Sequence, residues 1–209
     1  MVRFTEIANA DDGNFAEAIA IYSAAFPANE RHPVELIRER VRQGSCRLHV
    51  GYVKSEVVFF ALVWPLANTD FVLLDYMATK EAFQNRGIGS SFMKTIRETL
   101  ARNKQRFIIE VEDLNYGANK EQRQRRLAFY KRAGAKEMKD VSYILPGLDG
   151  TEPTKMNLLV FPAQPNESMT GPPVKNLLIQ IYRELYGRDR DDALLGSFIN
   201  SIGDRIELV

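Results

Sequence analysis

Cysteine, histidine and net charge are all scarce in this sequence, and each shortage excludes a class of protein. The chain has one cysteine, Cys46, so no disulfide can form within it. Its two histidines, His32 and His49, lack the close spacing of metal-binding motifs, so we expect no metal site. The formal net charge is +1, which provides no overall attraction to nucleic acid or to a membrane surface.

Long apolar runs are missing as well. The longest, residues 57–64, is far shorter than the roughly 20 residues that a helix needs to span a bilayer. The first residues soon become acidic and polar, without the apolar core of a signal peptide. We therefore expect a cytoplasmic protein that does not enter the membrane.

The sequence does contain a succession of strand and helix patterns over residues 1–162. Alternating or continuous apolar positions predict strands at 2–7, 47–53, 56–64, 71–79, 106–112, 136–145 and 156–161. Apolar positions at helical spacing predict helices at 15–26, 33–44, 87–103 and 121–134. This order predicts an α+β fold, a mixed sheet of about seven strands flanked by helices, because a doubly wound sheet would alternate strictly.

The C-terminal part has a different composition. Residues 163–173 are rich in proline, glycine and small polar residues, which predicts a linker. Beyond it, apolar residues at 174, 178, 181 and 185 predict an amphipathic helix, and residues 191–202 predict another. We expect residues 174–209 to form a helical extension that packs on the domain of residues 1–162.

Two glycines, Gly87 and Gly89, open the helix that follows the strand at 71–79. The first turn of a helix has backbone N–H groups without internal partners, and the helix dipole adds positive charge there. Glycines let an anion approach the backbone closely, and Arg86 adds a cation. The P-loop pattern is absent, and Phe92 stands where a dinucleotide-binding motif needs its third glycine. The turn therefore predicts a phosphate site of another kind.

The stretch from Gln84 to Gly89, QNRGIG, resembles the (Q/R)-x-x-G-x-(G/A) signature of the GNAT superfamily of N-acetyltransferases. In that family the signature follows the fourth strand and opens a long helix, as expected here. Residues 126–135, RLAFYKRAGA, resemble a second family segment, in which Tyr130 falls on the family's tyrosine. The order of strands and helices is similar to the family's over about residues 1–162.

The resemblance implies transfer of an acetyl or longer acyl group from acetyl-CoA, as cosubstrate, to an amine. It implies that backbone N–H groups of Gln84 and of the residues that follow hold the pyrophosphate. It also implies that the end of the preceding strand pairs with the pantetheine arm and faces the thioester carbonyl. The residues given these cofactor-binding roles are Met77, Ala78, Thr79, Gln84, Asn85, Arg86, Gly87, Ile88, Gly89 and Ser90.

Tyr130 is the candidate catalytic acid, and a purely structural core tyrosine is the alternative. For the catalytic base the candidates are Asp75 on one strand and Glu110, with its rival Glu112, on another. Burial would raise the pKa of such a carboxyl toward neutrality, whereas a solvated or salt-bridged carboxylate is the alternative for each. Seven residues before Tyr130 the family often has an asparagine; here Arg123 stands there, and an arginine can reach a phosphate.

Several alternatives stay open. The amine acceptor is either a small molecule or a protein, and a non-catalytic acyl-CoA-binding module is the competing function. A nucleic-acid binder is disfavoured, because Phe129 and Tyr130 of the basic helix at 121–134 should face inward and so provide no interleaved aromatic platform. The loop at 27–33 either borders the acceptor pocket or only starts a helix. The C-terminal helices cover a sheet edge, shape the acceptor pocket or form a homodimer contact.

Overall fold

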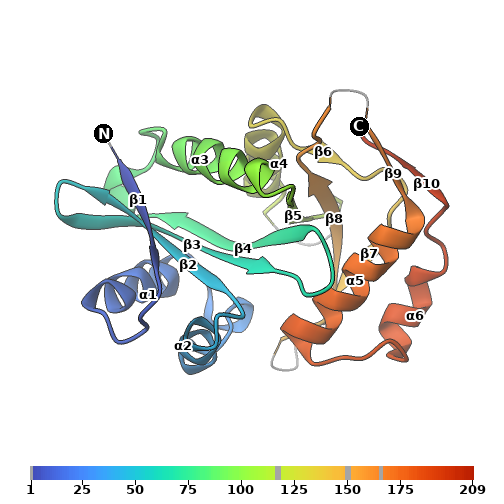
Figure 1. The fold of residues 1–209 in the computed structure, drawn as a ribbon, viewed down its shortest axis with the longest axis horizontal. Helices are drawn as coiled ribbons and strands as arrows, with labels where there is room; N and C mark the ends of the chain where they lie inside the picture. The colour runs from blue at the N-terminus through green and yellow to red at the C-terminus, as the bar shows by residue number, and fades with distance from the viewer. Residues whose placement is uncertain (1, 116–118, 149–151, 165–166) are drawn as a thin grey trace. The chain divides into compact units, whose positions relative to one another are not determined.

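The computed structural model describes residues 2–115, 119–148, 152–164 and 167–209, and the backbone but not the side chain of residue 29 (Figure 1). The fold class is the predicted one: α+β, with a mixed sheet of eight strands flanked by helices. The chain divides into two compact units, Met1–Pro65 with Leu73–Thr99 and Leu66–Val72 with Leu100–Val209. Each is described separately.

The first unit holds the first four strands and the first three helices, with small parts of β4 and α3 assigned to the other unit. Their bounds are β1 (Arg3–Ile7), α1 (Gly13–Ala25), α2 (Val34–Arg42), β2 (Arg47–Val53), β3 (Glu56–Pro65), β4 (Phe71–Thr79) and α3 (Ile88–Arg102), with short 3-10 turns at Ala28–Glu30 and Glu81–Phe83. Strand β2 runs antiparallel to both β1 and β3.

Both faces of β3 are covered, as its continuous apolar pattern predicts. The ring of Phe59 packs at a tilt against that of Phe92 of α3, with ring centroids 4.9 Å apart. The next residue, Phe60, packs against Tyr22 of α1, with centroids 5.6 Å apart. Because successive side chains of a strand point to opposite faces, α1 and α3 cover opposite faces of this part of the sheet, as Figure 1 shows.

The second unit holds the remaining elements. Their bounds are β5 (Arg106–Glu112), α4 (Lys120–Arg132), β6 (Lys136–Glu137), β7 (Tyr143–Leu145), β8 (Thr154–Val160), β9 (Ser168–Thr170), α5 (Gly171–Tyr186), α6 (Ala193–Ile199) and β10 (Arg205–Glu207). Strand β8 pairs antiparallel with β5, β6 and β7. Strands β9 and β10 form a separate two-stranded sheet.

Two segments of this unit differ from the expectation. The strand expected at 136–145 is divided into β6 and β7, and Asp140 between them has a positive φ of 60°, which a strand cannot contain. In the expected linker, residues 168–170 form β9 and residues 171–173 begin α5, with prolines in the first turn where their missing N–H has no cost. Residues 165 and 166 of that linker lie outside the described residues.

Both helices expected near the C-terminus are present. Helix α5 buries Val174, Leu178, Ile181 and Leu185 and ends at Gly187, which has a positive φ of 63°. Helix α6 begins where the Asp192 carboxylate accepts the N–H groups of Leu194 and Leu195. In the described part of the chain, no helix combines the length and apolar character required to cross a membrane.

Candidate functional site

The glycine turn leaves a row of backbone donors without acceptors. Asn85 and Gly87 have positive φ angles of 59° and 74°, so the chain reverses sharply before α3. The first N–H donated into the helix is that of Ser91, to the Gly87 carbonyl at 2.9 Å. Among the described residues, no backbone carbonyl accepts the N–H groups of residues 86–90. No atom lies within 4 Å of a Cβ built on Gly87, so the space above this backbone is open.

Gln84 forms hydrogen bonds within the protein in place of the expected contact with the pyrophosphate. Its N–H donates to the Glu81 carbonyl at 3.1 Å, which removes it from the donors aimed outward. Its side-chain Nε2 donates to the Thr79 carbonyl at 3.3 Å. Gln84 therefore ties the turn to the end of β4. The Arg86 guanidinium stacks over the Phe83 ring at 5.0 Å and remains exposed beside the turn.

A diphosphate needs several donors and room for its oxygens, and the turn offers both. The N–H groups at the start of α3 point along the positive end of the helix dipole. The residues present therefore fit the phosphate groups of a coenzyme. Along β4, Met77 lies two residues beyond Asp75, a rise of about 7 Å. Strand and turn thus bring the candidate base into the same segment as the expected coenzyme residues.

Asp75 lies in a polar cluster that is otherwise enclosed by apolar residues. Its side chain is 8% exposed, and Oδ2 accepts the indole N–H of Trp64 at 3.0 Å. The Arg40 guanidinium stacks over the Trp64 ring at 4.7 Å. Burial raises the pKa of Asp75 to about 7, against the opposing effects of the Trp64 hydrogen bond and the Arg40 charge. A carboxyl group with this pKa is suited to accept a proton near neutral pH.

His32 completes the cluster from the loop between α1 and α2. Its Nε2 lies 3.9 Å from Asp75 Oδ2. Burial, and then the positive charge of Arg40, lower the pKa of His32 to about 4. At neutral pH the imidazole is therefore uncharged, and the contact is not an ion pair.

Sequence reasoning missed Trp64 and Arg40 as neighbours of Asp75. One signal was available for Trp64. The hairpin between β3 and β4 closes where the Leu66 N–H donates to the Phe71 carbonyl at 3.1 Å. Extending this register places Trp64 opposite Leu73 and diagonal to Asp75, within reach of a long side chain. Arg40 and His32 come from other elements, so no local pattern indicated them.

The two candidate glutamates on β5 have different surroundings. The Glu112 carboxylate forms a 2.6 Å ion pair with Arg126 of α4, so it is already neutralised. Glu110 lies beside Tyr143, whose pKa is raised well above its ordinary value, first by burial and then by the Glu110 charge. This arrangement favours Glu110 over Glu112 as a proton acceptor, whereas Glu112 has the salt-bridged environment of a structural residue.

Tyr130 on α4 is 7% exposed. Burial raises its pKa to about 12, with the positive charge of Arg126 opposing and the negative charge of Glu112 adding to the rise. Tyr130 therefore holds its proton at neutral pH, as a donor to a leaving thiolate must. About two turns earlier on the same helix, Arg123 has its Nη1 buried without a hydrogen-bond partner among the described residues. An anionic ligand would satisfy this group.

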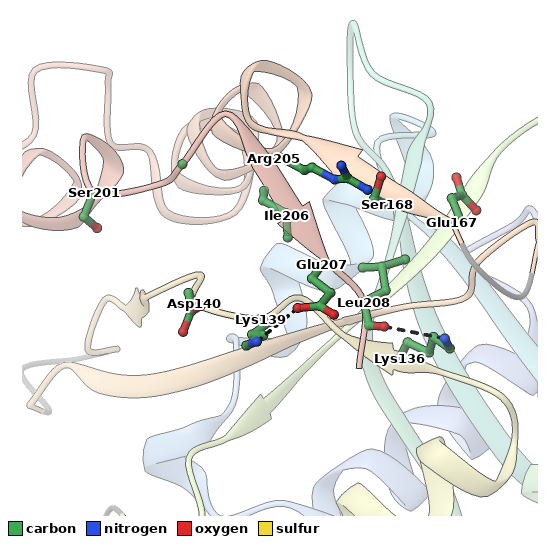
Figure 2. Close-up of a pocket in the computed structure, with 11 residues that line it drawn as sticks. Lys136, Lys139, Asp140, Glu167, Ser168, Ser201, Arg205, Ile206, Glu207 and Leu208 are labelled. Atoms are coloured by element: carbon green, nitrogen blue, oxygen red, sulfur yellow. Dashed lines mark hydrogen bonds and ion pairs between the residues drawn. The ribbon is translucent and has the colours of Figure 1, made fainter.

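A cavity of about 720 Å³ lies in the second unit, between β10, β9 and the segment after β6 (Figure 2). Its charges largely satisfy one another: Lys139 pairs with Glu207 at 3.0 Å, and Lys136 Nζ donates to the Leu208 carbonyl at 3.5 Å. Glu167 pairs with Arg106. The described residues contain no cluster of three or more histidine, cysteine, aspartate or glutamate side chains that could hold a metal ion.

Comparison with known proteins agrees with this geometry. Residues 44–134 match the model of the acetyltransferase (GNAT) domain. A protein from Bacteroides thetaiotaomicron, described as a GNAT-family acetyltransferase, is 22% identical over 90% of this chain and 99% of its own, with a TM-score of 0.74. No curated protein matches the chain.

Two other solved structures contain coenzyme A. An acetyltransferase from Bacillus subtilis in complex with coenzyme A is 13% identical, over 78% of this chain and 100% of its own, with a TM-score of 0.54. An aminoglycoside 6′-N-acetyltransferase complexed with coenzyme A is 13% identical, over 78% of this chain and 99% of its own, with a TM-score of 0.59. At these identities the solved structures establish the fold alone, and the domain match covers residues 44–134. The matched residues, 44–134, include the glycine turn, Asp75 and Tyr130.

Proposed function

We propose that the chain transfers an acetyl group from acetyl-CoA to a primary amine by direct attack of the amine on the thioester. The observation that carries this proposal is the row of unpaired N–H groups at residues 86–90, with open space beside Gly87. These donors would bind the pyrophosphate, and Arg123 would pair with another phosphate through its unpartnered Nη1. The backbone of Met77, Ala78 and Thr79 would pair with the pantetheine arm.

Acetyl-CoA supplies the activated acetyl group when it is bound. The nitrogen lone pair of the neutral amine would form the bond to the acetyl carbon, and the Asp75 carboxylate would take one proton from that nitrogen as the bond forms. An N–H near Met77 or Ala78 stabilises the negative charge on the thioester oxygen. Tyr130 donates its proton to the sulfur as the carbon–sulfur bond breaks, so the products are an amide and a thiol. Glu110 is the alternative base.

The acceptor class is a primary amine, on a small molecule or on a protein. One of the similar structures is an aminoglycoside acetyltransferase, which makes amino sugars a reasonable first member of an acceptor panel. Polyamines, amino acids and lysine peptides complete the panel. Thiol release with at least one amine supports the enzyme, whereas tight coenzyme binding with no thiol release from any amine supports a non-catalytic binding module.

The glycine turn gives a direct test of coenzyme binding. We expect Gly87→Asp to weaken acetyl-CoA affinity by about 100-fold in calorimetry, because a carboxylate beside the phosphates costs several kcal/mol. Gly187→Asp is the matched control, since Gly187 also has a positive φ and open space around it. It should bind acetyl-CoA like the wild type, with a similar loss of thermal stability. Equal affinity in both variants would exclude the glycine turn as the phosphate site.

A further inference from the structure

Two tyrosine hydroxyls hold the backbone of the loop that carries His32. The Tyr22 hydroxyl donates to the His32 carbonyl at 3.1 Å, and the Tyr76 hydroxyl donates to the Glu30 carbonyl at 2.9 Å. His32 itself is 4% exposed, so it does not project from the surface toward a passing substrate. The backbone anchors instead hold the imidazole inside the first unit, facing Asp75.

The imidazole of His32 faces Asp75 Oδ2, the oxygen that already accepts the Trp64 hydrogen bond. Trp64 donates to Oδ2 at 3.0 Å, and His32 Nε2 lies 3.9 Å from the same atom. This separation exceeds a direct hydrogen bond, so the two groups are close neighbours without a direct hydrogen bond in this structure. The described contacts leave Oδ1 without a protein partner. One carboxylate oxygen is therefore surrounded by N–H groups, and the other remains available.

Other charged and titratable groups surround His32. Arg40 approaches from α2 and Arg31 from the loop itself, where it lies over the Tyr22 ring. Burial raises the pKa of Cys46, which follows α2, to about 12, and it raises the pKa of Tyr76 well above its ordinary value. Asp75 is the group of this cluster that changes charge around pH 7.

We propose that His32 is a positioning residue for Asp75, with its neutral imidazole presenting Nε2–H to Oδ2 so that Oδ1 receives the amine proton. In this arrangement the amine loses one proton, Asp75 gains it, and His32 keeps its own. The two N–H groups orient the carboxylate and stabilise its charged form. This inference rests on the proposed function, in which Asp75 is the base.

The two histidines of the chain make an internal comparison in one sample. His49 is also partly buried, and burial followed by the Arg47 charge lowers its pKa to about 4, as for His32. It packs against Phe92 with ring centroids 5.6 Å apart, on the opposite face of the sheet. In NMR spectra of isotope-labelled histidine at neutral pH, we expect His32 as the Nε2–H tautomer. Asp75→Asn should shift the ring nitrogens of His32 and leave those of His49 in place. An Nδ1–H tautomer, or no response of His32, would overturn the proposal.

A second measurement reads the effect on Asp75. We expect His32→Leu to raise the pH midpoint of thiol release by roughly one unit, the size of one lost hydrogen bond to a charged group. His32→Gln, which keeps an N–H donor, should restore most of this shift. A purely structural role would lower thermal stability in both variants and leave the midpoint unchanged, and that result would overturn the proposal.

The same midpoint is measured from the carboxyl carbon of Asp75 by NMR, which requires neither coenzyme nor acceptor. Failure of the proposed function would appear in the wild type as no coenzyme binding and no thiol release. Failure of the His32 inference would appear as an Asp75 midpoint that neither His32 variant moves. The two failures are therefore distinguishable, and His32→Gln remains informative if His32→Leu does not fold.

Discussion

Asp75 in the first unit and Tyr130 in the second are both buried, and burial raises the pKa of both groups, to about 7 and about 12. The same physical cause has opposite consequences, because desolvation disfavours the charged form of each group. For the carboxyl, it produces a base that is half ionised near neutrality. For the phenol, it secures the proton. Under the proposed function, these environments suit Asp75 to accept a proton and Tyr130 to donate one.

The neighbours of the two groups explain why burial dominates in both. Asp75 accepts the neutral N–H of Trp64, and this hydrogen bond and the Arg40 charge lower the pKa of Asp75 less than burial raises it. Near Tyr130, Arg126 and Glu112 have opposite effects on the pKa and pair with each other at 2.6 Å. Because the Arg126 and Glu112 charges pair directly, their effects on the Tyr130 pKa largely cancel. Burial is therefore the main cause of the raised pKa of Tyr130.

The largest expected effect comes from removing the acceptor. We expect Asp75→Asn to lower turnover by about 1,000-fold, within the usual range for loss of a general base, with little change in acetyl-CoA affinity. The amide oxygen still accepts the Trp64 N–H, so the fold should persist. Steady-state kinetics with the best amine of the panel measure the change.

Asp70→Asn is the control for this variant. Asp70 lies just before β4 and is half exposed in an ion pair with Arg106. We expect its turnover to match that of the wild type. Normal turnover in Asp75→Asn would break the comparison and favour Glu110 as the base.

A smaller effect is expected from removing the donor. Tyr130→Phe should lower turnover by about tenfold, less than is usual for a general acid, because a thiolate leaves without a proton more readily than an amine does. The acetyl-CoA dissociation constant should stay the same. Tyr52→Phe, at a tyrosine of similar burial, is the matched control. If both variants turn over equally fast, Tyr130 has only a packing role.

The smallest effect is expected for a carboxylate that is already paired. Glu112→Gln should leave turnover unchanged and lower the free energy of unfolding by less than about 1 kcal/mol, because its ion pair with Arg126 is partly exposed. Chemical denaturation measures this difference. Glu121→Gln, which removes an exposed pair with Arg125 on the same helix, is the control. A large loss of turnover in Glu112→Gln alone would assign chemistry to the salt bridge.

The sequence was sufficient to predict the features that depend on neighbouring residues. The helix that begins at Ile88 follows from the glycines before it and the apolar spacing after it. The continuous apolar pattern of β3 predicted its burial on both faces. Helix α5 and α6 likewise follow from their apolar positions and from the Asp192 cap.

Features built from distant segments could not be predicted in this way. Strands β9 and β10 have three residues each and pair across 34 intervening positions of the chain, so neither has a periodic pattern to recognise. The surroundings of the Asp75 side chain are formed by Trp64, Arg40 and His32, which come from three other segments of the chain. A period of two indicated its strand but not its burial.

The pH dependence of thiol release from acetyl-CoA tests the central claim most directly. With a saturating amine, the wild-type rate should rise with pH through a midpoint near 7 and then level off, because Asp75 must lose its proton to act as the base. The rise should be absent in Asp75→Asn. A rise with the same midpoint in that variant would show that another group accepts the proton and would contradict the account.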